Sequence, residues 1–293
     1  MNISDYIAER SARVERALDL LVPAETTLPA TIHKAMRYSL FAGGKRIRPV
    51  LCFAACDAVV GQAPGIEHIA ATLEMIHTYS LIHDDLPALD NDDLRRGRPT
   101  NHKVFGEAMA ILAGDSLLTL AFEVLGKLNT TADKAIRLVA ELATASGTVG
   151  GMIGGQVEDI EGERQPPTIE LLDRIHRAKT GALLRASVRM GAIYAGATDG
   201  QLAALSNYGE HIGLAFQIVD DILDVEQSSE SLGKTAGKDA AQQKITFPAV
   251  YGLELSRQMA ARELTLAREA LESFGEQAET LRAIASLIVH RKA

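Results

Sequence analysis

Residues 67–85, EHIAATLEMIHTYSLIHDD, decide the kind of fold that this chain can form. Apolar residues recur in the stretch at intervals of three and four, which is the period of an α-helix. The same spacing returns at 260–274, AARELTLAREALESF. Period-two runs of β-branched residues bounded by turn residues, which would indicate strands, are almost absent. The sequence therefore predicts an all-α protein.

Glycine- and proline-containing breaks divide the chain into roughly nine to eleven predicted helices. No break is long enough to be an interdomain linker, and no short-period repeat is present. We therefore expect residues 1–293 to form one large helical domain. The breaks fall at 23–29, 43–44, 61–65, 87–99, 129–133, 162–167, 196–200 and 228–237.

The composition is that of a globular protein and argues against several functions. Hydrophobic residues make up 47% of the 293 residues, charged residues 23% and aromatic residues 4%, with no Trp and a net charge of -8. Nucleic-acid binding is not expected, because it needs a dominant basic face or aromatic stacking surfaces.

Cysteine usage and hydropathy predict a cytoplasmic protein. Cys52 and Cys56 are four residues apart in an apolar run, a spacing that favours two buried thiols over a disulfide. Residues 1–21 are charged and helix-periodic, unlike a secretion signal. No apolar run free of charge reaches the roughly 18 residues of a membrane span, so stable membrane insertion is not expected.

An acidic segment follows the first helix discussed: 83-HDDLPALDNDDLRRGRPTNH-102. On an unbroken helix, Asp84 and Asp90 would lie about 120° apart and could not share an ion. Pro87 cannot donate to the carbonyl of His83, so the helix should kink or end near Leu86. The chain is then free to bring Asp90 back toward Asp84. The roles of two further acids, Asp92 and Asp93, stay open, and His83 is expected on the helix surface.

A second acidic group lies in 216-FQIVDDILDVE-226. Asp220 and Asp224 are one helical turn apart, on the stripe that also carries Gln217. Apolar residues surround them nearly all round, so these acids are expected to face a cavity and to need a bound cation. Oxygen ligands without Cys or His favour a hard ion such as Mg²⁺. A solvated acidic face is the alternative.

Basic residues at the breaks suggest what the acids hold. They occur in 43-GGKRIRP-49, 95-RRGR-98 and 233-GKTAGKD-239. Arg and Lys bind phosphate oxygens, and Mg²⁺ held by few carboxylates keeps positions open for them. We therefore expect the two acidic clusters to be two walls of one cavity that binds a diphosphate through Mg²⁺. Solvated surface charge is the alternative for each basic pair taken alone.

The ordered blocks GGKRIRP, LIHDDLPALDNDDLRRGRPTNH, GDSLLT, GGQVEDIEGE, KTGALL, FQIVDDILD and GKTAGKD resemble the trans-isoprenyl diphosphate synthases, and more narrowly the bacterial farnesyl diphosphate synthase type. The likeness runs from about residue 30 to residue 250. It implies the isoprenoid synthase fold, an all-α barrel around a deep cavity, normally as a homodimer. It also implies three Mg²⁺ ions per active site, with Mn²⁺ as a substitute, and diphosphate substrates.

The resemblance assigns a role to individual residues of this chain. Each group below corresponds to one function in the family. The metal ligands are Asp84, Asp85 and Asp90 of the first motif and Asp220, Asp221 and Asp224 of the second. The allylic diphosphate contacts are Arg95, Lys179 and Lys234, and the metal-free isopentenyl diphosphate site is Lys45, Arg48, His77 and Arg96. Thr180 and Gln217 face the reacting carbons, with Lys179 and Lys234 counted among the catalytic residues, and residues 228–239 form a lid.

The family reaction is ionisation of an allylic diphosphate, attack by the double bond of isopentenyl diphosphate, and loss of a proton. Tyr79, five residues before Asp84, is typical of farnesyl synthases, and Ser80 lies one turn below Asp84. The resemblance therefore implies a farnesyl product. Geranylgeranyl or geranyl diphosphate synthase, a class I terpene cyclase and a non-catalytic synthase subunit are the alternatives.

Overall fold

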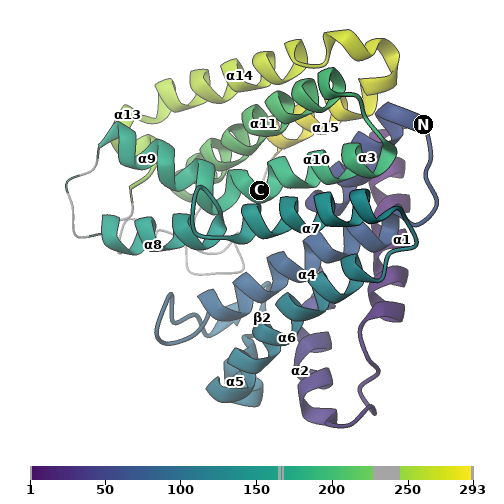
Figure 1. The fold of residues 1–293 in the computed structure, drawn as a ribbon. Helices are drawn as coiled ribbons and strands as arrows, with labels where there is room; N and C mark the ends of the chain where they lie inside the picture. Colours follow the sequence, from purple (N-terminus) through teal and green to yellow (C-terminus); the bar gives the residue numbers. More distant parts are fainter. Residues whose placement is uncertain (1, 164–165, 167, 227–244, 292–293) are drawn as a thin grey trace. The chain divides into compact units, whose positions relative to one another are not determined.

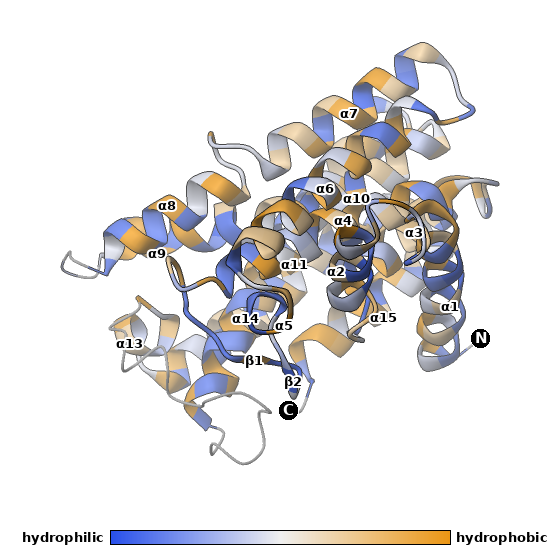
Figure 2. Ribbon diagram, turned by 90° about the horizontal axis from the view of Figure 1, so that it is seen from below, coloured by the Kyte–Doolittle hydropathy of each residue, from blue (hydrophilic) through white to orange (hydrophobic). Residues whose placement is uncertain are grey.

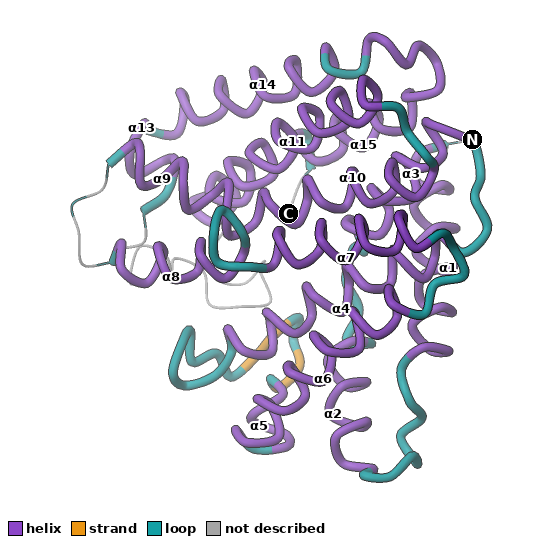
Figure 3. Tube along the Cα trace, viewed as in Figure 1, coloured by secondary structure: helices purple, strands orange, loops and turns teal. Residues whose placement is uncertain are grey.

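The computed structural model describes residues 2–163, 166, 168–226 and 245–291, and helices account for most of them (Figures 1 and 3). The all-α prediction is confirmed. The exception in the described range is one antiparallel pair of two-residue strands, β1 (Leu94–Arg95) and β2 (Arg98–Pro99). Figure 2 shows this hairpin in the blue of hydrophilic residues.

The chain divides into two compact units. The first unit contains Met1–Phe53 and Pro64–Val139, and the second contains Ala54–Ala63 and Ala140–Ala293. The single-domain interpretation of residues 1–293 stays a prediction.

The first unit is built around α4 (Ile66–Asp84), which contacts α1, α2 and α6. Twelve of its residues are buried, from Ile66 to Ile82, because apolar side chains surround it nearly all round. The unit also contains α1 (Ile3–Leu21), α2 (Ala30–Leu40), α5 (Asn101–Phe105) and α6 (Glu107–Gly126); α3 (Ile47–Val60) and α7 (Ala132–Ser146) begin in it and end in the second unit.

Among the described helices, only α6 is long and apolar enough to cross a membrane by length and composition, with a mean hydropathy of 1.7. That is weak evidence of a span, since core helices of soluble proteins pass the same test. One face of α6 packs against α2, α4 and α5, and 39% of its apolar window is buried.

The second unit is built around α11 (Asp199–Glu226), which contacts α10 and α14 along its length. Tyr208 of α11 is fully buried, and its hydroxyl donates to the carbonyl of Leu281 at 2.8 Å. The other elements are α8 (Met152–Gly162), α9 (Ile169–His176), the π-helix η1 (Arg177–Gly181), α10 (Ala182–Ala195), α13 (Phe247–Tyr251), α14 (Leu253–Glu269), the 3₁₀-helix η2 (Glu272–Ala278) and α15 (Glu279–Val289).

Glycines allow α8 and α11 to approach η1 closely. A Cβ at Gly155 of α8 would lie 2.2 Å from the backbone nitrogen of Lys179 in η1. A Cβ at Gly213 of α11 would lie 2.9 Å from the Cα of Gly181. The π-helix is thus held between two helices at distances that only glycine permits, and π-helical turns are common at functional sites.

Substitution of Gly155 by Ala should destabilise the protein by about 1–3 kcal/mol, because the methyl group would overlap backbone that cannot rotate away. Gly200→Ala is the matched control, since its Cβ in the first turn of α11 would meet no heavy atom within 4 Å. That control should leave the free energy of unfolding unchanged or raise it by up to about 1 kcal/mol. Urea unfolding measures both, and equal stability of Gly155→Ala and wild type would contradict the close approach.

Candidate functional site

The first acidic segment leaves α4 in a turn around Pro87. The helix ends at Asp84, and the amide of Leu86 donates to the carbonyl of His83 at 3.0 Å. The amide of Asp90 then donates to the carbonyl of Asp84 at 2.8 Å. The backbone therefore folds back on itself, and the predicted return of Asp90 toward Asp84 is confirmed.

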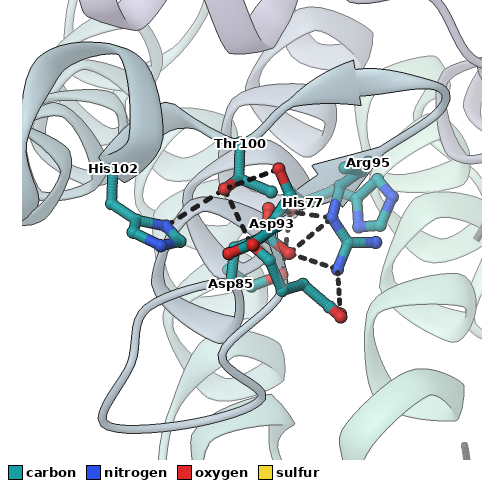
Figure 4. Close-up of polar contacts among 8 residues, drawn as sticks. His77, Asp85, Asp93, Arg95, Thr100 and His102 are labelled. Carbon is teal, nitrogen blue, oxygen red and sulfur yellow. Dashed lines mark hydrogen bonds and ion pairs between the residues drawn. The ribbon is translucent and has the colours of Figure 1, made fainter. Parts of the chain in front are cut away.

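Asp85 and Arg95 form a bidentate ion pair in the first unit (Figure 4). The guanidinium Nε lies 2.8 and 3.0 Å from the two carboxylate oxygens, and Nη2 lies 2.6 Å from one of them. Burial raises the pKa of Asp85, which is 3% exposed, while Arg95 opposes this rise. Burial lowers the pKa of Arg95, but its hydrogen bonds to Asp85 together with the negative charges of the nearby aspartates raise the pKa overall. The pair fixes β1 against the end of α4.

Asp92 and Asp93 contact the β1–β2 hairpin and α5. Thr100 donates through its hydroxyl to the carbonyl of Asp92 at 2.7 Å and through its amide to the carbonyl of Asp93 at 3.0 Å (Figure 4). The carboxylate of Asp92 lies 3.9 Å from Arg95, and that of Asp93 pairs with Lys103 at 3.0 Å. The roles that the sequence left open are therefore contacts within the hairpin and to α5.

Arg96 docks on the glycine loop that precedes α3. Its guanidinium donates to the carbonyl of Gly43, and a Cβ at Gly44 would lie 2.7 Å from its Nη1. Gly44 therefore leaves the space that Arg96 fills. Lys45 follows as an exposed residue of the same loop.

His77 of α4 lies in the electrostatic field of these arginines. Burial, together with the positive charges of Arg48 and Arg96, lowers the pKa of His77 well below its usual range. The ring is therefore neutral at pH 7 and can donate one hydrogen bond to an anion without adding to the charge. Lys45, Arg48, His77 and Arg96, predicted from separate segments, all belong to this part of the first unit.

The two predicted chain-length residues lie on α4. Tyr79 is 5% exposed, and its ring packs edge-on against His83 with centroids 5.8 Å apart. His83, expected on the helix surface, is 26% exposed and also contacts α6: its Nε2 donates to the carbonyl of Ile111, and a Cβ at Gly114 would lie 2.1 Å from that nitrogen. The hydroxyl of Ser80 donates to a backbone carbonyl of its own helix. Tyr79 thus packs against the His83 ring, which is bonded to α6.

Asp221 of the second motif is buried and bonded within the second unit. One carboxylate oxygen accepts hydrogen bonds from His176 Nε2 and from the amide of Phe247, each at 2.9 Å. The carboxylate is 6% exposed and the imidazole 5% exposed, and the His176 ring packs edge-on against Phe247. Asp221 therefore joins α9 and α13 to α11. Nothing in the sequence marked His176 as its partner.

The other acids of α11 are more exposed than Asp221. The carboxylate of Asp220 is 46% exposed and pairs with Arg291. Asp224, one turn further along the helix, is half-buried. Gln217, one turn before Asp220, is also half-buried and lines a small cavity.

This cavity has a volume of about 150 Å³ and includes Lys179, Thr180, Gln217 and Asp221. Lys179 Nζ donates to the carboxylate of Asp159 on α8 at 2.6 Å. The sequence predicted Lys179, Thr180 and Gln217 as functional residues, and the second unit brings them together. Asp159 was missed, although it lies in the quoted block GGQVEDIEGE. Lys234 and the predicted lid 228–239 lie outside the described residues.

A larger hollow of about 870 Å³ borders η1 in the same unit. It lacks the predicted site residues, and each of its three arginines is already paired with a carboxylate. The pairs are Arg174 with Glu158, Arg177 with Asp173, and Arg185 with Glu210. The predicted residues Lys179, Thr180 and Gln217 therefore line the smaller cavity and not this hollow.

The carboxylates fit a hard divalent ion that is completed by substrate. No group of three or more His, Cys, Asp or Glu residues within the described ranges is arranged to hold a metal by itself. Mg²⁺ needs no such cage, because one or two carboxylates with phosphate oxygens and water complete its octahedron. Asp84 and Asp90 on one turn, and Asp220 and Asp224 on one helix face, are donor pairs of that kind.

Comparison with known proteins agrees with this geometry. The family described as Polyprenyl synthetase matches residues 29–287. The heterodimeric geranylgeranyl pyrophosphate synthase large subunit 1 of Arabidopsis thaliana is 50% identical over 98% of this chain and 79% of that protein. The geranylgeranyl pyrophosphate synthase of Capsicum annuum is 49% identical over 99% of this chain and 79% of that protein.

A solved structure extends the likeness to the fold. The putative farnesyl-diphosphate synthase from Marinomonas sp. MED121 has a TM-score of 0.84 and 41% identity, over 99% of both chains. The described helices, the acidic turn after α4 and the acidic face of α11 thus occur in a chain related to these proteins over almost its whole length. The chain belongs to the polyprenyl synthetase family and has the all-α isoprenoid synthase fold.

Proposed function

We propose that this protein is a chain-elongating prenyltransferase that condenses isopentenyl diphosphate with dimethylallyl or geranyl diphosphate to give trans,trans-farnesyl diphosphate. The observation that carries the proposal is the placement of two different anion sites on α4. His77 faces a group of arginines, and the acidic turn begins at Asp84, two helical turns further along. One site is suited to a metal-free diphosphate and the other to a diphosphate that arrives with divalent ions.

Each residue of the first unit has a distinct task in this proposal. Asp84 and Asp90 hold divalent ions on the allylic diphosphate, and Mg²⁺ supplies the positive charge that stabilises it as a leaving group. The ion pair with Asp85 orients Arg95 toward the same diphosphate. Lys45, Arg48, His77 and Arg96 bind isopentenyl diphosphate without a metal.

The reaction needs no protein nucleophile. The bond between carbon 1 and oxygen of the allylic diphosphate breaks, and its electron pair leaves with the diphosphate. The double bond of isopentenyl diphosphate attacks the resulting allylic cation and forms the new carbon–carbon bond. A proton then passes to the departing diphosphate, which leaves a trans product five carbons longer.

Residues of the second unit serve the ionising substrate. Lys179 brings a positive charge that Asp159 orients, and Asp220 and Asp224 bring carboxylates for a further divalent ion. The side-chain oxygens of Thr180 and Gln217 line the cavity and can stabilise positive charge on carbon. We also propose that the protein acts as a homodimer.

The farnesyl product is supported by the packing of Tyr79. Its side chain is bulky, 5% exposed and held by His83, so it makes a rigid barrier to a longer chain. Geranylgeranyl diphosphate is the second candidate product, because relatives at 49–50% identity carry geranylgeranyl synthase names.

Product analysis tests the function. The protein is incubated with Mg²⁺, labelled isopentenyl diphosphate and each allylic diphosphate in turn, and the product chains are separated after dephosphorylation. Farnesol as the main alcohol is expected, and geranylgeraniol would select the second candidate. Release of a hydrocarbon from an allylic diphosphate alone would indicate a cyclase, and no elongation with any starter would refute the function.

Substitution of Asp84 or Asp220 by Asn should lower kcat by at least about 10²–10³-fold, because each loses a charge that stabilises the leaving diphosphate. Asp93→Asn is the matched control: it removes an exposed carboxylate that pairs with Lys103, and activity should stay within about twofold. Steady-state kinetics at saturating Mg²⁺ measures the effect. Near-wild-type turnover of either site variant would sink its assignment as a metal ligand.

Tyr79→Ala should lengthen the product, because the missing ring opens space beside α4. Tyr79→Phe is the control, since it keeps the ring and removes a buried hydroxyl that has no hydrogen-bond partner among the described residues. The Phe variant should retain the wild-type product. An unchanged chain length in Tyr79→Ala would show that other side chains stop the chain.

A further inference from the structure

Arg46 of the GGKRIRP segment is buried, and each of its three guanidinium nitrogens donates a hydrogen bond inside the first unit. It is 3% exposed, whereas Lys45 beside it is exposed. Its Nε donates to Glu15 of α1 at 2.7 Å, and its Nη1 donates to Glu74 of α4 at 2.6 Å. Its Nη2 donates to the carbonyl of Leu40, at the end of α2, at 2.7 Å. One guanidinium thus joins three helices.

The backbone of Arg46 also fixes the start of α3. Its φ of 48° lies in the left-handed region, which costs a non-glycine residue free energy of order 1 kcal/mol and persists where contacts enforce it. Its carbonyl accepts the amide of Val50 at 3.0 Å, the first hydrogen bond of the helix. Arg48 lies in that first turn and Lys45 lies just before it. The side-chain bonds of Arg46 therefore fix the loop from which both neighbours extend.

Glu74 supplies a buried negative charge at the base of the arginine group. It is 2% exposed and lies one helical turn before His77 on α4. Burial lowers the pKa of Arg96, the charge of Glu74 opposes that change, and Arg46 adds to it. Cations gathered at one place repel one another and lose hydration, so a buried carboxylate stabilises their approach.

We propose that Arg46 and Glu74 are a pair of positioning residues for the isopentenyl diphosphate site. Neither touches the substrate. Arg46 holds the loop that presents Lys45 and Arg48, and Glu74 holds Arg46 and offsets part of the charge around His77. This inference rests on the proposed function, because it assumes that this arginine group binds isopentenyl diphosphate.

A purely electrostatic role and a positioning role predict opposite effects. If Glu74 acted only through its charge, its removal would make the site more positive and tighten diphosphate binding. If it positions the loop through Arg46, its removal frees the loop and weakens binding. Arg46→Lys also distinguishes the electrostatic role from the positioning role. It keeps the positive charge but cannot form the three hydrogen bonds of the planar guanidinium.

The experiment measures isopentenyl diphosphate binding by calorimetry and steady-state kinetics with geranyl diphosphate as the co-substrate. Glu74→Gln and Arg46→Lys should each raise Kd and KM for isopentenyl diphosphate about tenfold or more, while KM for geranyl diphosphate stays within about twofold. Glu15→Gln is the matched control. It removes a bond to the same guanidinium, but its carboxylate is 40% exposed, so the effect should be within about threefold.

A double variant, Arg46→Met with Glu74→Leu, guards against a loss of folding. Apolar replacements of a buried ion pair often fold well, and thermal unfolding verifies this here. The double variant should be folded and should still bind isopentenyl diphosphate weakly. Should Glu74→Gln fail to fold, Arg46→Lys and the double variant decide the outcome.

Three results would overturn the inference. They are tighter or unchanged binding in the single variants, wild-type binding in the stable double variant, or an equal rise in KM for both substrates. These differ from a failure of the proposed function. In that case the wild-type protein itself would neither bind isopentenyl diphosphate nor consume it.

Discussion

The bidentate pair of Arg95 with Asp85 illustrates a constraint on both candidate sites: cations that lie close together are held in place by carboxylate partners. The pair joins β1 to the end of α4 through three short contacts. Lys179 is held in the same way by Asp159. A carboxylate partner reduces the repulsion among clustered cations and orients each one, so little ordering remains to be done on binding.

The two aspartate motifs show the same pattern of burial in their adjacent acids. In each, the second member of the Asp-Asp pair is buried, Asp85 at 3% and Asp221 at 5% exposure, and is bonded to protein groups. The first members, Asp84 and Asp220, are more exposed. Adjacent helical residues point about 100° apart, so one acid faces inward while its neighbour faces outward. Each motif thus pairs a buried acid that is bonded to protein groups with a more exposed acid beside it, and the assignment of both as metal ligands stays a prediction.

Much of this architecture follows from local rules in the sequence. The buried helix up to Asp84 follows from its three-to-four periodicity, and the turn after it follows from Pro87. The partners of Asp221 and Lys179 do not, because His176 and Asp159 reach them through tertiary packing between helices far apart in sequence. Arg46 could not be separated from its basic neighbours either. Composition gives all of them the same charge, and only the packing of α1 and α4 shows that Arg46 is bonded to Glu15 and Glu74.

Product length is the property for which overall similarity is least informative. This chain shares about half of its residues with relatives named as geranylgeranyl pyrophosphate synthases. The stopping point of an isoprenoid chain depends instead on whether one or two side chains fill the path, since dense packing cannot yield to a further five carbons. Tyr79, the residue proposed to stop the chain, packs its ring against His83, which itself fits only because residue 114 is glycine. The length limit proposed for Tyr79 therefore depends on the packing of α4 against α6.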